Sequence, residues 1–444
     1  MTGDSPRILF LAPSAYPLGG VQTWLDYLLP GLVERGWRAT LGLVAGRFHD
    51  VSRYLSVHPW SDTVAIRNPT GSREGRVRAL LATIERLRPA VVVSVNIPDS
   101  FAAVERLRLR RQHAPRVVMT NHSVEAQYLG DAKSWRAVLD AIIGTNRLTC
   151  HLAMEWAGLE PSRVFYAPYG VEVPSSMCQV DAHPGPLRIA YSGRLDDEQK
   201  RVGDIPGILE RLEAAGVAYE LRLAGAGPAE AALAERLRSQ VEAGRARFLG
   251  VLAPDALSRQ LYDWADLLLV TSYWETGPIV IWEAMARGLP VVTSRYIGSG
   301  LENSLRDGDN CLMFPIGDVA AAAEQLQRMN DPGRRAELAA RGRALVAERY
   351  TRPHSVKQWD ACLRTILSQP RQRSLSSGRL NPPAGRLDRW LGIKAGESAR
   401  RRLRIEFAHS SAGGEWPHVA GGGVVDQAAF LRRAADLDRR GEGH

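Results

Sequence analysis

The sequence has few cysteines and no long hydrophobic run. Only 4 of its 444 residues are cysteine, they lie far apart, and none forms a C-x-x-C pair or stands beside a His pair. This spacing argues against a zinc site and a disulfide framework, and it favours a reducing cytoplasm. No apolar segment approaches the ~18 residues that span a bilayer. The short apolar run at residues 8–12 follows acidic Asp4 and precedes a helical pattern, so we interpret it as a first strand and not as a signal peptide.

The remaining composition is that of a globular, basic protein. Hydrophobic residues make up 45% and charged residues 24% of the chain, and a length of 444 predicts roughly two or three domains. The 57 Lys and Arg exceed the 48 Asp and Glu, which gives a net charge of +9. This excess favours anionic partners such as phosphates or acidic lipids. Because the cations are scattered and no recognition motif accompanies them, we expect no nucleic acid partner.

Short apolar runs alternate with helical patterns in two parts of the chain. The predicted strands of the first part are residues 8–11, 39–44, 91–95, 117–120 and 141–144, and those of the second are 189–191, 221–224, 248–251, 267–270 and 291–293. The first predicted helix has one apolar stripe, formed by Val21, Trp24, Leu25, Leu28, Leu29 and Leu32. Buried strands that alternate with helices predict an α/β protein with two parallel, doubly wound sheets.

These patterns predict four regions. Residues 1–182 form an N-terminal domain, and residues 183–352 form a C-terminal domain, after a linker at residues 181–186. Residues 353–368 form a closing helix that returns toward the first domain, and the basic residues 369–444 form a mostly flexible tail with a Gly run at 421–423. Doubly wound domains bind ligands at the carboxyl ends of their strands. We therefore expect the site in a central cleft between the two domains.

The strongest chemical signal runs from Glu275 to Glu283. It begins where a predicted strand gives way to a helix, so Thr276 and Gly277 offer backbone N–H groups at a helix N-terminus, where a phosphate is favoured. Glu283 falls about two turns later, where it can accept hydrogen bonds from sugar or ribose hydroxyls. The alternative is that Glu275 only complements the helix dipole and Glu283 is an exposed helix residue.

This segment resembles the E-x7-E motif of retaining GT-B glycosyltransferases, in particular family four (glycosyl transferases group 1). Similar to that family, the motif is followed by Gly288-Leu289-Pro290-Val291-Val292. Further similar segments are residues 192–194, 225–228, 307–310 and 314–315. The resemblance covers residues 7–367. It implies a GT-B fold with two Rossmann-like domains, in which residues 1–182 bind the acceptor and residues 183–352 bind the nucleotide sugar. It also implies a hexosyl- or N-acetylhexosaminyl-transferase that moves a sugar from a nucleotide diphosphate with retention of configuration.

A basic pair follows the predicted strand at residues 189–191. Arg194 and Lys200 can both reach one diphosphate there, and their charge would stabilise the departing nucleotide. In the family the lysine is usually followed directly by glycine, whereas here Arg201 intervenes. This leaves open whether Lys200 or Arg201 is the second phosphate cation, and solvated surface cations are the alternative for all of them.

Two features of the N-terminal half also match the family. Gly19 and Gly20 lie between the first strand and the first helix, where the missing Cβ atoms let the backbone approach a ligand, and the resemblance implies a donor phosphate there. His122 ends a predicted strand and matches a histidine that the family points at the donor sugar. An ordinary turn and a structural histidine are the alternatives. Asp99 is a weaker candidate for orienting the acceptor; we favour an ordinary loop carboxylate, so the acceptor-binding residues stay unknown.

The resemblance implies a role for each matched residue. Glu275 would hold the hydroxyls of the transferred sugar and Glu283 the ribose. The implied catalytic residues are His122, Glu275, Arg194 and Lys200. The implied donor-binding residues are Gly19, Gly20, Arg194, Lys200, Thr276, Gly277, Pro278, Ile279 and Glu283.

We expect neither a metal nor a cofactor. The D-x-D patterns Asp307-Gly308-Asp309 and Asp436-Leu437-Asp438 lack the context of a metal motif, and no H-x-H or H-E-x-x-H occurs. Arg194, Lys200 and helix amides would then supply the positive charge. The donor is a UDP-, GDP- or ADP-sugar, and the base is not readable from the sequence.

The expected acceptor is a carbohydrate or a lipid-linked molecule, in polysaccharide or glycolipid assembly. A cationic segment and an apolar stretch of the tail offer a peripheral contact with an anionic membrane, at the inner face of the plasma membrane, but for the cations we favour a solvated helix face. These residues are Arg106, Arg108, Arg110, Arg111 and Arg116, and Trp390, Leu391 and Ile393 beside residues 400–404. The alternatives to a transferase are a catalytically silent GT-B scaffold or regulatory partner, and an epimerase or phosphorylase of the same fold.

Overall fold

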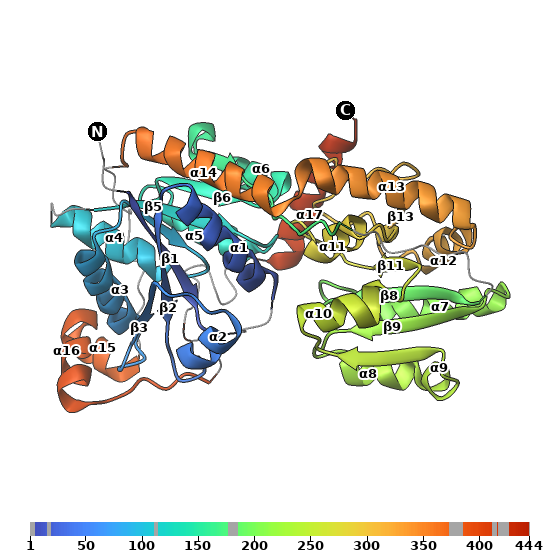
Figure 1. Cartoon of the computed structure of the whole chain (residues 1–444). Coiled ribbons are helices and arrows are strands. Elements are labelled where there is room, and N and C mark those ends of the chain that lie inside the picture. Colours follow the sequence, from blue (N-terminus) through green and yellow to red (C-terminus); the bar gives the residue numbers. More distant parts are fainter. Residues whose placement is uncertain are drawn as a thin grey trace. The chain divides into compact units, whose positions relative to one another are not determined.

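The computed structural model describes residues 5–15, 19–110, 114–175, 185–372, 385–410, 415 and 426–443. The chain forms two compact units, and each is described below by itself (Figure 1). Unit 1 comprises Met1–Pro168 and Ser355–Arg432, and unit 2 comprises Tyr169–His354 and Arg433–His444. The boundary between the two units therefore lies after Pro168, ahead of the linker expected at residues 181–186. Residues 181–184 of that linker lie outside the described residues.

Unit 1 is built on a parallel sheet of seven strands in the order β3-β2-β1-β4-β5-β6-β7. The strands are β1 (Arg7–Pro13), β2 (Arg38–Val44), β3 (Thr63–Ile66), β4 (Val91–Ser94), β5 (Arg116–Asn121), β6 (Ala141–Gly144) and β7 (Val164–Tyr166). In register, Ile8 of β1 lies opposite Ala39 of β2 and Val91 of β4. The strand order reverses between β1 and β4, which is where such sheets open a ligand crevice at their carboxyl ends.

The helices of unit 1 contact one another in several places. They are α1 (Gly20–Glu34), α2 (Val51–Val57), α3 (Arg73–Leu87), α4 (Asp99–Leu109), α5 (Ala126–Trp135), α6 (Arg147–Glu155) and α14 (Arg352–Ser368). α1 contacts α14, because Tyr27 Oη lies 3.2 Å from Ser355 Oγ and the rings of Trp24 and Trp359 are 5.0 Å apart. α3 and α4 lie side by side (Figure 1). α14 covers the residues expected for the closing helix, 353–368, and its part from Ser355 onward belongs to unit 1.

Unit 2 repeats the architecture with a parallel sheet of six strands in the order β10-β9-β8-β11-β12-β13. The strands are β8 (Leu187–Ser192), β9 (Tyr219–Ala224), β10 (Ala246–Gly250), β11 (Leu267–Val270), β12 (Val291–Ser294) and β13 (Leu312–Phe314). Here the order reverses between β8 and β11, so the crevice of this sheet lies where the loops after β8 and β11 meet.

Two hydrophobic clusters cover the two faces of this second sheet. Ile189 and Leu267 belong to one cluster, whereas their neighbours Ala190 and Leu268 belong to the other, as the alternation of strand side chains requires. The helices are α7 (Ile205–Ala214), α8 (Glu230–Arg236), α9 (Arg238–Glu242), α10 (Pro254–Leu257), α11 (Ile279–Ala286), α12 (Val319–Arg328) and α13 (Pro332–Arg349). The Asp318 side chain caps α12, since it accepts from the N–H groups of Ala320 and Ala321 at 3.1 and 2.9 Å.

All the predicted strands are confirmed, and three short ones were missed. β3 and β7 have only four and three residues and are only partly buried, and β13 is also a three-residue strand. The apolar stripe predicted from Val21 lies on α1, where Trp24, Leu25, Leu28, Leu29 and Leu32 are buried. The two sheets confirm the prediction of an α/β chain with two Rossmann-like domains.

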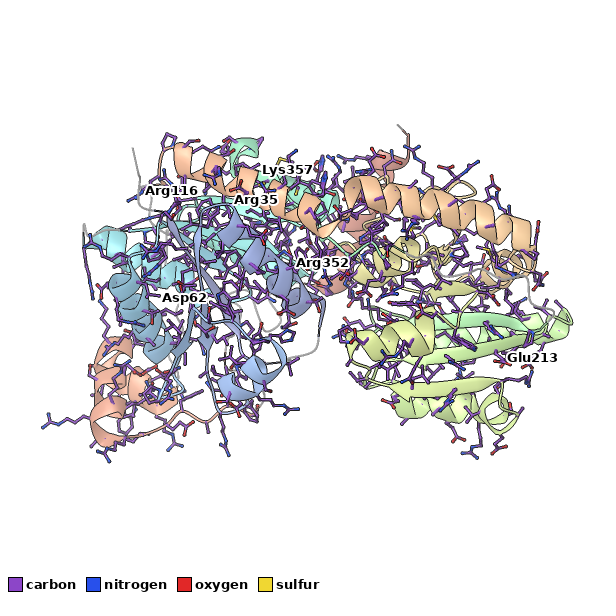
Figure 2. All side chains as sticks on the ribbon, in the orientation of Figure 1. Arg35, Asp62, Arg116, Glu213, Arg352 and Lys357 are labelled. Atoms are coloured by element: carbon purple, nitrogen blue, oxygen red, sulfur yellow. The ribbon has the colours of Figure 1, made fainter. Side chains whose placement is uncertain are left out.

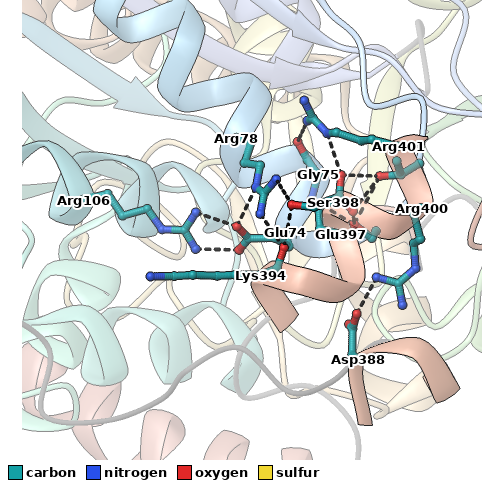
Figure 3. Close-up of polar contacts among 12 residues, drawn as sticks. Glu74, Gly75, Arg78, Arg106, Asp388, Lys394, Glu397, Ser398, Arg400 and Arg401 are labelled. Atoms are coloured by element: carbon teal, nitrogen blue, oxygen red, sulfur yellow. Dashed lines mark hydrogen bonds and ion pairs between the residues drawn. The ribbon is translucent and has the colours of Figure 1, made fainter. Parts of the chain in front are cut away.

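The expectation of a mostly flexible tail is wrong for much of that segment. α15 (Gly385–Leu391) and α16 (Ile393–Leu403) form a pair beside α3 (Figure 3). Glu397 is fully buried and accepts from Thr70 Oγ1 at 3.0 Å and Ser72 Oγ at 2.5 Å, while Arg78 donates to the carbonyl of Lys394 at 2.8 Å. These bonds hold the tail on unit 1 through polar contacts that composition does not reveal.

The tail also carries its own internal ion pair and a last helix. Arg400 Nη1 lies 2.5 Å from Asp388 Oδ1, and both side chains are buried between α15 and α16 (Figure 3). α17 (Gln427–Asp438) follows. The Gly run at 421–423 lies outside the described residues.

Candidate functional site

The loops after β8 and β11 are joined by hydrogen bonds at the carboxyl edge of the second sheet. The N–H of Tyr273 donates to the carbonyl of Gln199 at 2.7 Å, and Gln199 Nε2 donates to the carbonyl of Trp274 at 3.1 Å. Thr271 Oγ1 donates to the carbonyl of Lys200 at 2.7 Å. The basic loop is therefore fixed against the start of the Glu275 motif, at the point where the strand order reverses.

Lys200 and Glu275 meet directly in this joint. Lys200 Nζ lies 2.5 Å from Glu275 Oε1, which also accepts from Ser272 Oγ at 2.6 Å. Only 6% of Glu275 is exposed. A carboxylate so shielded is stabilised by a charged partner and a hydroxyl donor together. The pair places one cation and one anion at the carboxyl ends of β8 and β11.

The other two cations of the loop point elsewhere. Arg194 is largely exposed, and its guanidinium donates to Asp196 Oδ2 at 2.7 Å and to Gln199 Oε1 at 2.9 Å. Arg201 has a left-handed backbone, with φ of 49°, and it donates to both oxygens of Asp204. The sequence names Lys200 as the second phosphate cation and leaves Arg201 open as the alternative. In the structure Lys200 contacts the motif carboxylate, and Arg201 is paired with Asp204.

The helix after Glu275 begins two residues later than the sequence indicates. Gly277 has a φ of 100°, Pro278 is the N-cap, and α11 starts at Ile279. The first N–H groups of a helix have no intrahelical acceptor, so the start of α11 offers donors. Pro278 has no N–H of its own, and it contributes by its fixed φ of −66°. Thr276 and Gly277 thus form the turn that leads into the helix.

Glu283 lies on α11 in a shielded environment, so the alternative of an exposed helix residue is wrong. It accepts a hydrogen bond from Tyr262 Oη at 2.9 Å. Burial raises the pKa of the Glu283 carboxyl above its ordinary value. Its neighbour Trp282 stacks on Tyr350, with ring centroids 4.0 Å apart, which fixes the helix.

Glycines let the strand-end loops approach one another. A Cβ on Gly225 would stand 1.9 Å from the carbonyl oxygen of Gly193, and one on Gly227 would stand 2.3 Å from the carbonyl oxygen of Leu195. Side chains at these two positions would push the loop after β9 away from the basic loop after β8. The glycines of residues 225–228 are therefore explained by this packing.

The predicted site residues of unit 1 follow strands β1 and β5. Gly19 is the N-cap of α1 and Gly20 its first residue. One turn further, the Trp24 ring packs on His122, with centroids 4.9 Å apart. Burial lowers the pKa of His122 to about 3. His122 is therefore a neutral imidazole near pH 7, able to hydrogen-bond but carrying no charge.

This lowered pKa predicts a pH dependence of stability. Between pH 6.5 and about 3 the unfolded chain binds a proton at His122 that the folded chain does not. The free energy of unfolding then falls as the pH falls through this window, by at most about 1.4 kcal/mol per pH unit. We expect His122→Gln, which cannot titrate, to show a shallower decline when unfolding is followed from pH 6.5 to 4. Equal slopes in the two proteins would contradict this assignment.

Asp99 is a buried structural carboxylate and not an ordinary loop residue. It is the first residue of α4, and its two oxygens lie 2.6 Å from Nε of Arg73 and of Arg76. Burial alone would raise the pKa of Asp99, but the two guanidinium groups hold it below its usual range. The carboxylate ties α4 to α3. Glu302 is likewise buried and accepts from Tyr350 Oη at 2.8 Å.

The cationic segment expected at a membrane is largely paired. Arg106 contacts Glu74, Arg108 contacts Asp140 and Arg110 contacts Glu85. Arg116, labelled in Figure 2, donates to the carbonyls of Leu367 and Gln369. Arg111 lies outside the described residues. Across the part of the chain that the structure describes, no helix has the length and hydrophobicity to cross a membrane.

The D-x-D carboxylates have other partners. Asp307 pairs with Arg295 and Asp309 with Arg341, while Asp436 pairs with Arg439. Within the described ranges, no group of three or more His, Cys, Asp or Glu side chains is placed to hold a metal ion.

Sequence reasoning missed several residues that complete the site. Ser272 and Gln199 stand beside the recognised motifs, so their neighbourhood was a usable signal. Asp196, which holds Arg194 and accepts from the N–H of Gln199, lies in the same loop. Tyr262 had no local signal, because it reaches Glu283 across 21 positions of sequence.

Comparison with known proteins shows what the second unit is similar to. Residues 186–331 match the family model described as Glycosyl transferases group 1. The D-inositol 3-phosphate glycosyltransferase of Acidothermus cellulolyticus is 35% identical over 120 residues, which are 27% of this chain and 24% of that protein. The putative colanic acid biosynthesis glycosyltransferase WcaL of Salmonella typhimurium is 27% identical over 221 residues, 47% of this chain and 53% of that protein. The matched parts thus span about half of these curated relatives or less.

Solved structures match over both units. The apo form of the lipopolysaccharide outer core galactosyltransferase WaaB has a TM-score of 0.66 at 16% identity, covering 81% of this chain and 99% of that one. Anabaena Alr3699/HepE, in complex with UDP and glucose, has a TM-score of 0.65 at 18% identity, with 81% and 99% covered. The fold is therefore GT-B. Residues 186–331 are similar to the glycosyl transferases group 1 family.

Proposed function

We propose that this protein is a retaining glycosyltransferase that moves a sugar from a nucleotide diphosphate sugar to an acceptor hydroxyl, in cytoplasmic assembly of a polysaccharide or glycolipid. The observation that carries the proposal is the 2.5 Å contact of Lys200 with Glu275, beside the N-terminus of α11. It joins a cation for a diphosphate and a carboxylate for sugar hydroxyls at the reversal point of one sheet. The name of WcaL, a relative in colanic acid biosynthesis, supports the polysaccharide setting.

Each of the site residues in unit 2 has a distinct role in this proposal. Arg194 and Lys200 hold the diphosphate, and the N–H groups at the start of α11 add donors without a formal charge. Glu283 holds the ribose hydroxyls, and Glu275 holds hydroxyls of the transferred sugar. HepE was solved with UDP and glucose on the same fold, which supports a nucleotide sugar as the ligand.

We infer the transfer step from the resemblance to retaining GT-B glycosyltransferases. The acceptor oxygen forms a bond to the anomeric carbon on the face from which the nucleotide diphosphate leaves, so the configuration is retained. The bond from that carbon to the diphosphate oxygen breaks, and the departing phosphate takes the proton of the acceptor hydroxyl. The cations stabilise the charge that develops on the leaving diphosphate. We propose that no metal is needed, because Arg194 and Lys200 supply that charge.

Turnover tests this proposal directly. Wild-type protein is incubated with UDP-, GDP- and ADP-sugars and a panel of glycan and glycolipid acceptors, and the products are analysed by NMR. We expect one donor to be consumed only with an acceptor, with the anomeric configuration kept and the rate unchanged in EDTA. Turnover without an acceptor, or with inorganic phosphate, would instead indicate an epimerase or phosphorylase. Loss of activity in EDTA that Mn²⁺ restores would overturn the metal-independent mechanism.

Contact with an anionic membrane remains a separate expectation from the sequence. Trp390 is 84% exposed at the end of α15, beside exposed Leu391, so this helix end is where the chain would meet lipid. The paired arginines of α4 contribute less free charge to such a contact than the sequence suggests.

A further inference from the structure

The last helix of the chain ends on a loop of unit 2. Asp438 is the final residue of α17, and only 5% of it is exposed. Its Oδ2 accepts from the N–H groups of Gly298 at 2.7 Å and Gly300 at 3.0 Å, and its Oδ1 accepts from the N–H of Leu301 at 2.8 Å. Three backbone N–H groups that converge on one carboxylate form an anion-binding nest.

The helix dipole does not explain a carboxylate at the C-terminus of α17. The C-terminus of a helix carries partial negative charge, which disfavours an acidic side chain in the last turn. Burial of an ionised group adds a further cost unless hydrogen bonds compensate it. The three N–H donors supply that compensation, so the position of Asp438 is explained by the loop that it contacts.

Glycines on both sides allow this close contact. Gly298 has a φ of 113°, in the region that glycine tolerates best. A Cβ on Gly300 would stand 2.4 Å from the carbonyl oxygen of Asp438, and one on Gly441 would stand 2.6 Å from Cα of Leu301. Larger residues at 300 and 441 would separate the chain end from the loop.

The loop that binds Asp438 is also hydrogen-bonded to the backbone of Glu275. Ile297, which precedes Gly298, donates its N–H to the carbonyl of Tyr273 at 2.9 Å and accepts from the N–H of Glu275 at 3.0 Å. These bonds make a short parallel bridge between Trp274 and Ile297. The backbone of Glu275 is therefore fixed by the residue next to the nest.

We propose that Asp438 is a positioning residue: its carboxylate, bound in the nest of Gly298, Gly300 and Leu301, holds the loop that fixes the backbone of Glu275. The inference rests on the proposed function, because it gives α17 a part in presenting Glu275 to the transferred sugar. The second carboxylate of the C-terminal D-x-D pattern, Asp438, thus acts as an internal anion that backbone N–H groups bind.

Two substitutions and a matched control test the proposal in the full-length chain. Asp438→Ala removes all three acceptor contacts, whereas Asp438→Asn keeps one oxygen that can still accept from Gly298 and Gly300. The control is Asp436→Ala, which removes an exposed carboxylate paired with Arg439 on the same turn. The first readout is amide hydrogen exchange at residues 298, 300 and 301. We expect exchange about tenfold faster in Asp438→Ala, an intermediate rate in Asp438→Asn and the wild-type rate in Asp436→Ala.

The second readout separates positioning from a merely structural role. At a temperature well below the unfolding transition of every variant, we expect kcat to fall about tenfold in Asp438→Ala and less in Asp438→Asn. The affinity for the free nucleotide should stay at the wild-type value, because Glu283 and Arg194 hold that part of the donor. Unchanged exchange in Asp438→Ala would overturn the anchor. Faster exchange with wild-type kcat would overturn the positioning role. A wild-type protein that transfers no sugar would remove the proposed function, while the exchange rates would still report whether the anchor exists.

Discussion

Glu275→Gln is expected to lower the turnover of sugar transfer by about 100-fold, which corresponds to roughly 3 kcal/mol of barrier. Glutamine keeps the volume and can still accept from Ser272 Oγ, but it carries no charge. Lys200 Nζ, now 2.5 Å from Glu275, would lose its anionic partner, and the sugar hydroxyls would lose a charged acceptor. Because the substitution is isosteric, the fold should persist, and steady-state kinetics at saturating donor measure the effect.

The matched control for this prediction is Glu198→Gln, which neutralises an exposed carboxylate in the same basic loop. It should leave turnover within about twofold of the wild type, since an exposed charge contributes little. If Glu275→Gln retained more than half of the wild-type rate, the assigned role of the motif carboxylate would be wrong.

Glu397→Ala is expected to lower the free energy of unfolding of unit 1 by about 3 kcal/mol. The carboxylate is fully buried and accepts from Thr70 Oγ1, Ser72 Oγ and Arg401 Nε. Its removal leaves two hydroxyls without their acceptor and opens a cavity between α16 and α3. Urea unfolding of the full chain, followed by hydrogen exchange in α3 and α16, measures this change for unit 1 separately.

The control for the tail is Glu406→Ala, which alters an exposed carboxylate of the same segment. It should change the free energy of unfolding by less than about 0.5 kcal/mol. An equally small effect of Glu397→Ala would mean that α15 and α16 are not docked on α3, as the composition of the tail first suggested.

How much of the structure the sequence predicts depends on how far apart the interacting residues lie in the chain. The apolar runs that give β1, β4, β8 and β11 are local, so their strands were predictable. The meeting of Lys200 with Glu275 spans 75 positions, and only the family resemblance brought the two residues together.

Long-range polar contacts account for what the sequence did not reveal. Glu397 reaches Thr70 across 327 positions, and Asp438 reaches Gly298 across 140. An Arg-, Gly- and Ser-rich segment has the composition of a flexible tail, and only its partners on α3 and the loop after β12 explain why it folds. Burial of Glu283 against Tyr262 was equally invisible, since helix periodicity does not identify the partner of a carboxylate.

The central claim is that unit 2 binds a nucleotide sugar, and calorimetric titration of UDP, GDP and ADP tests it most directly. The titrations use the wild type, Glu283→Ala and, as a control, Glu324→Ala, whose carboxylate is exposed on α12. We expect one nucleotide to bind the wild type and the control with equal affinity, and to bind Glu283→Ala more weakly by roughly 1 to 3 kcal/mol, because hydrogen bonds to a charged group are lost. A folded wild-type protein that binds none of the three nucleotides would contradict the claim and favour a catalytically silent scaffold.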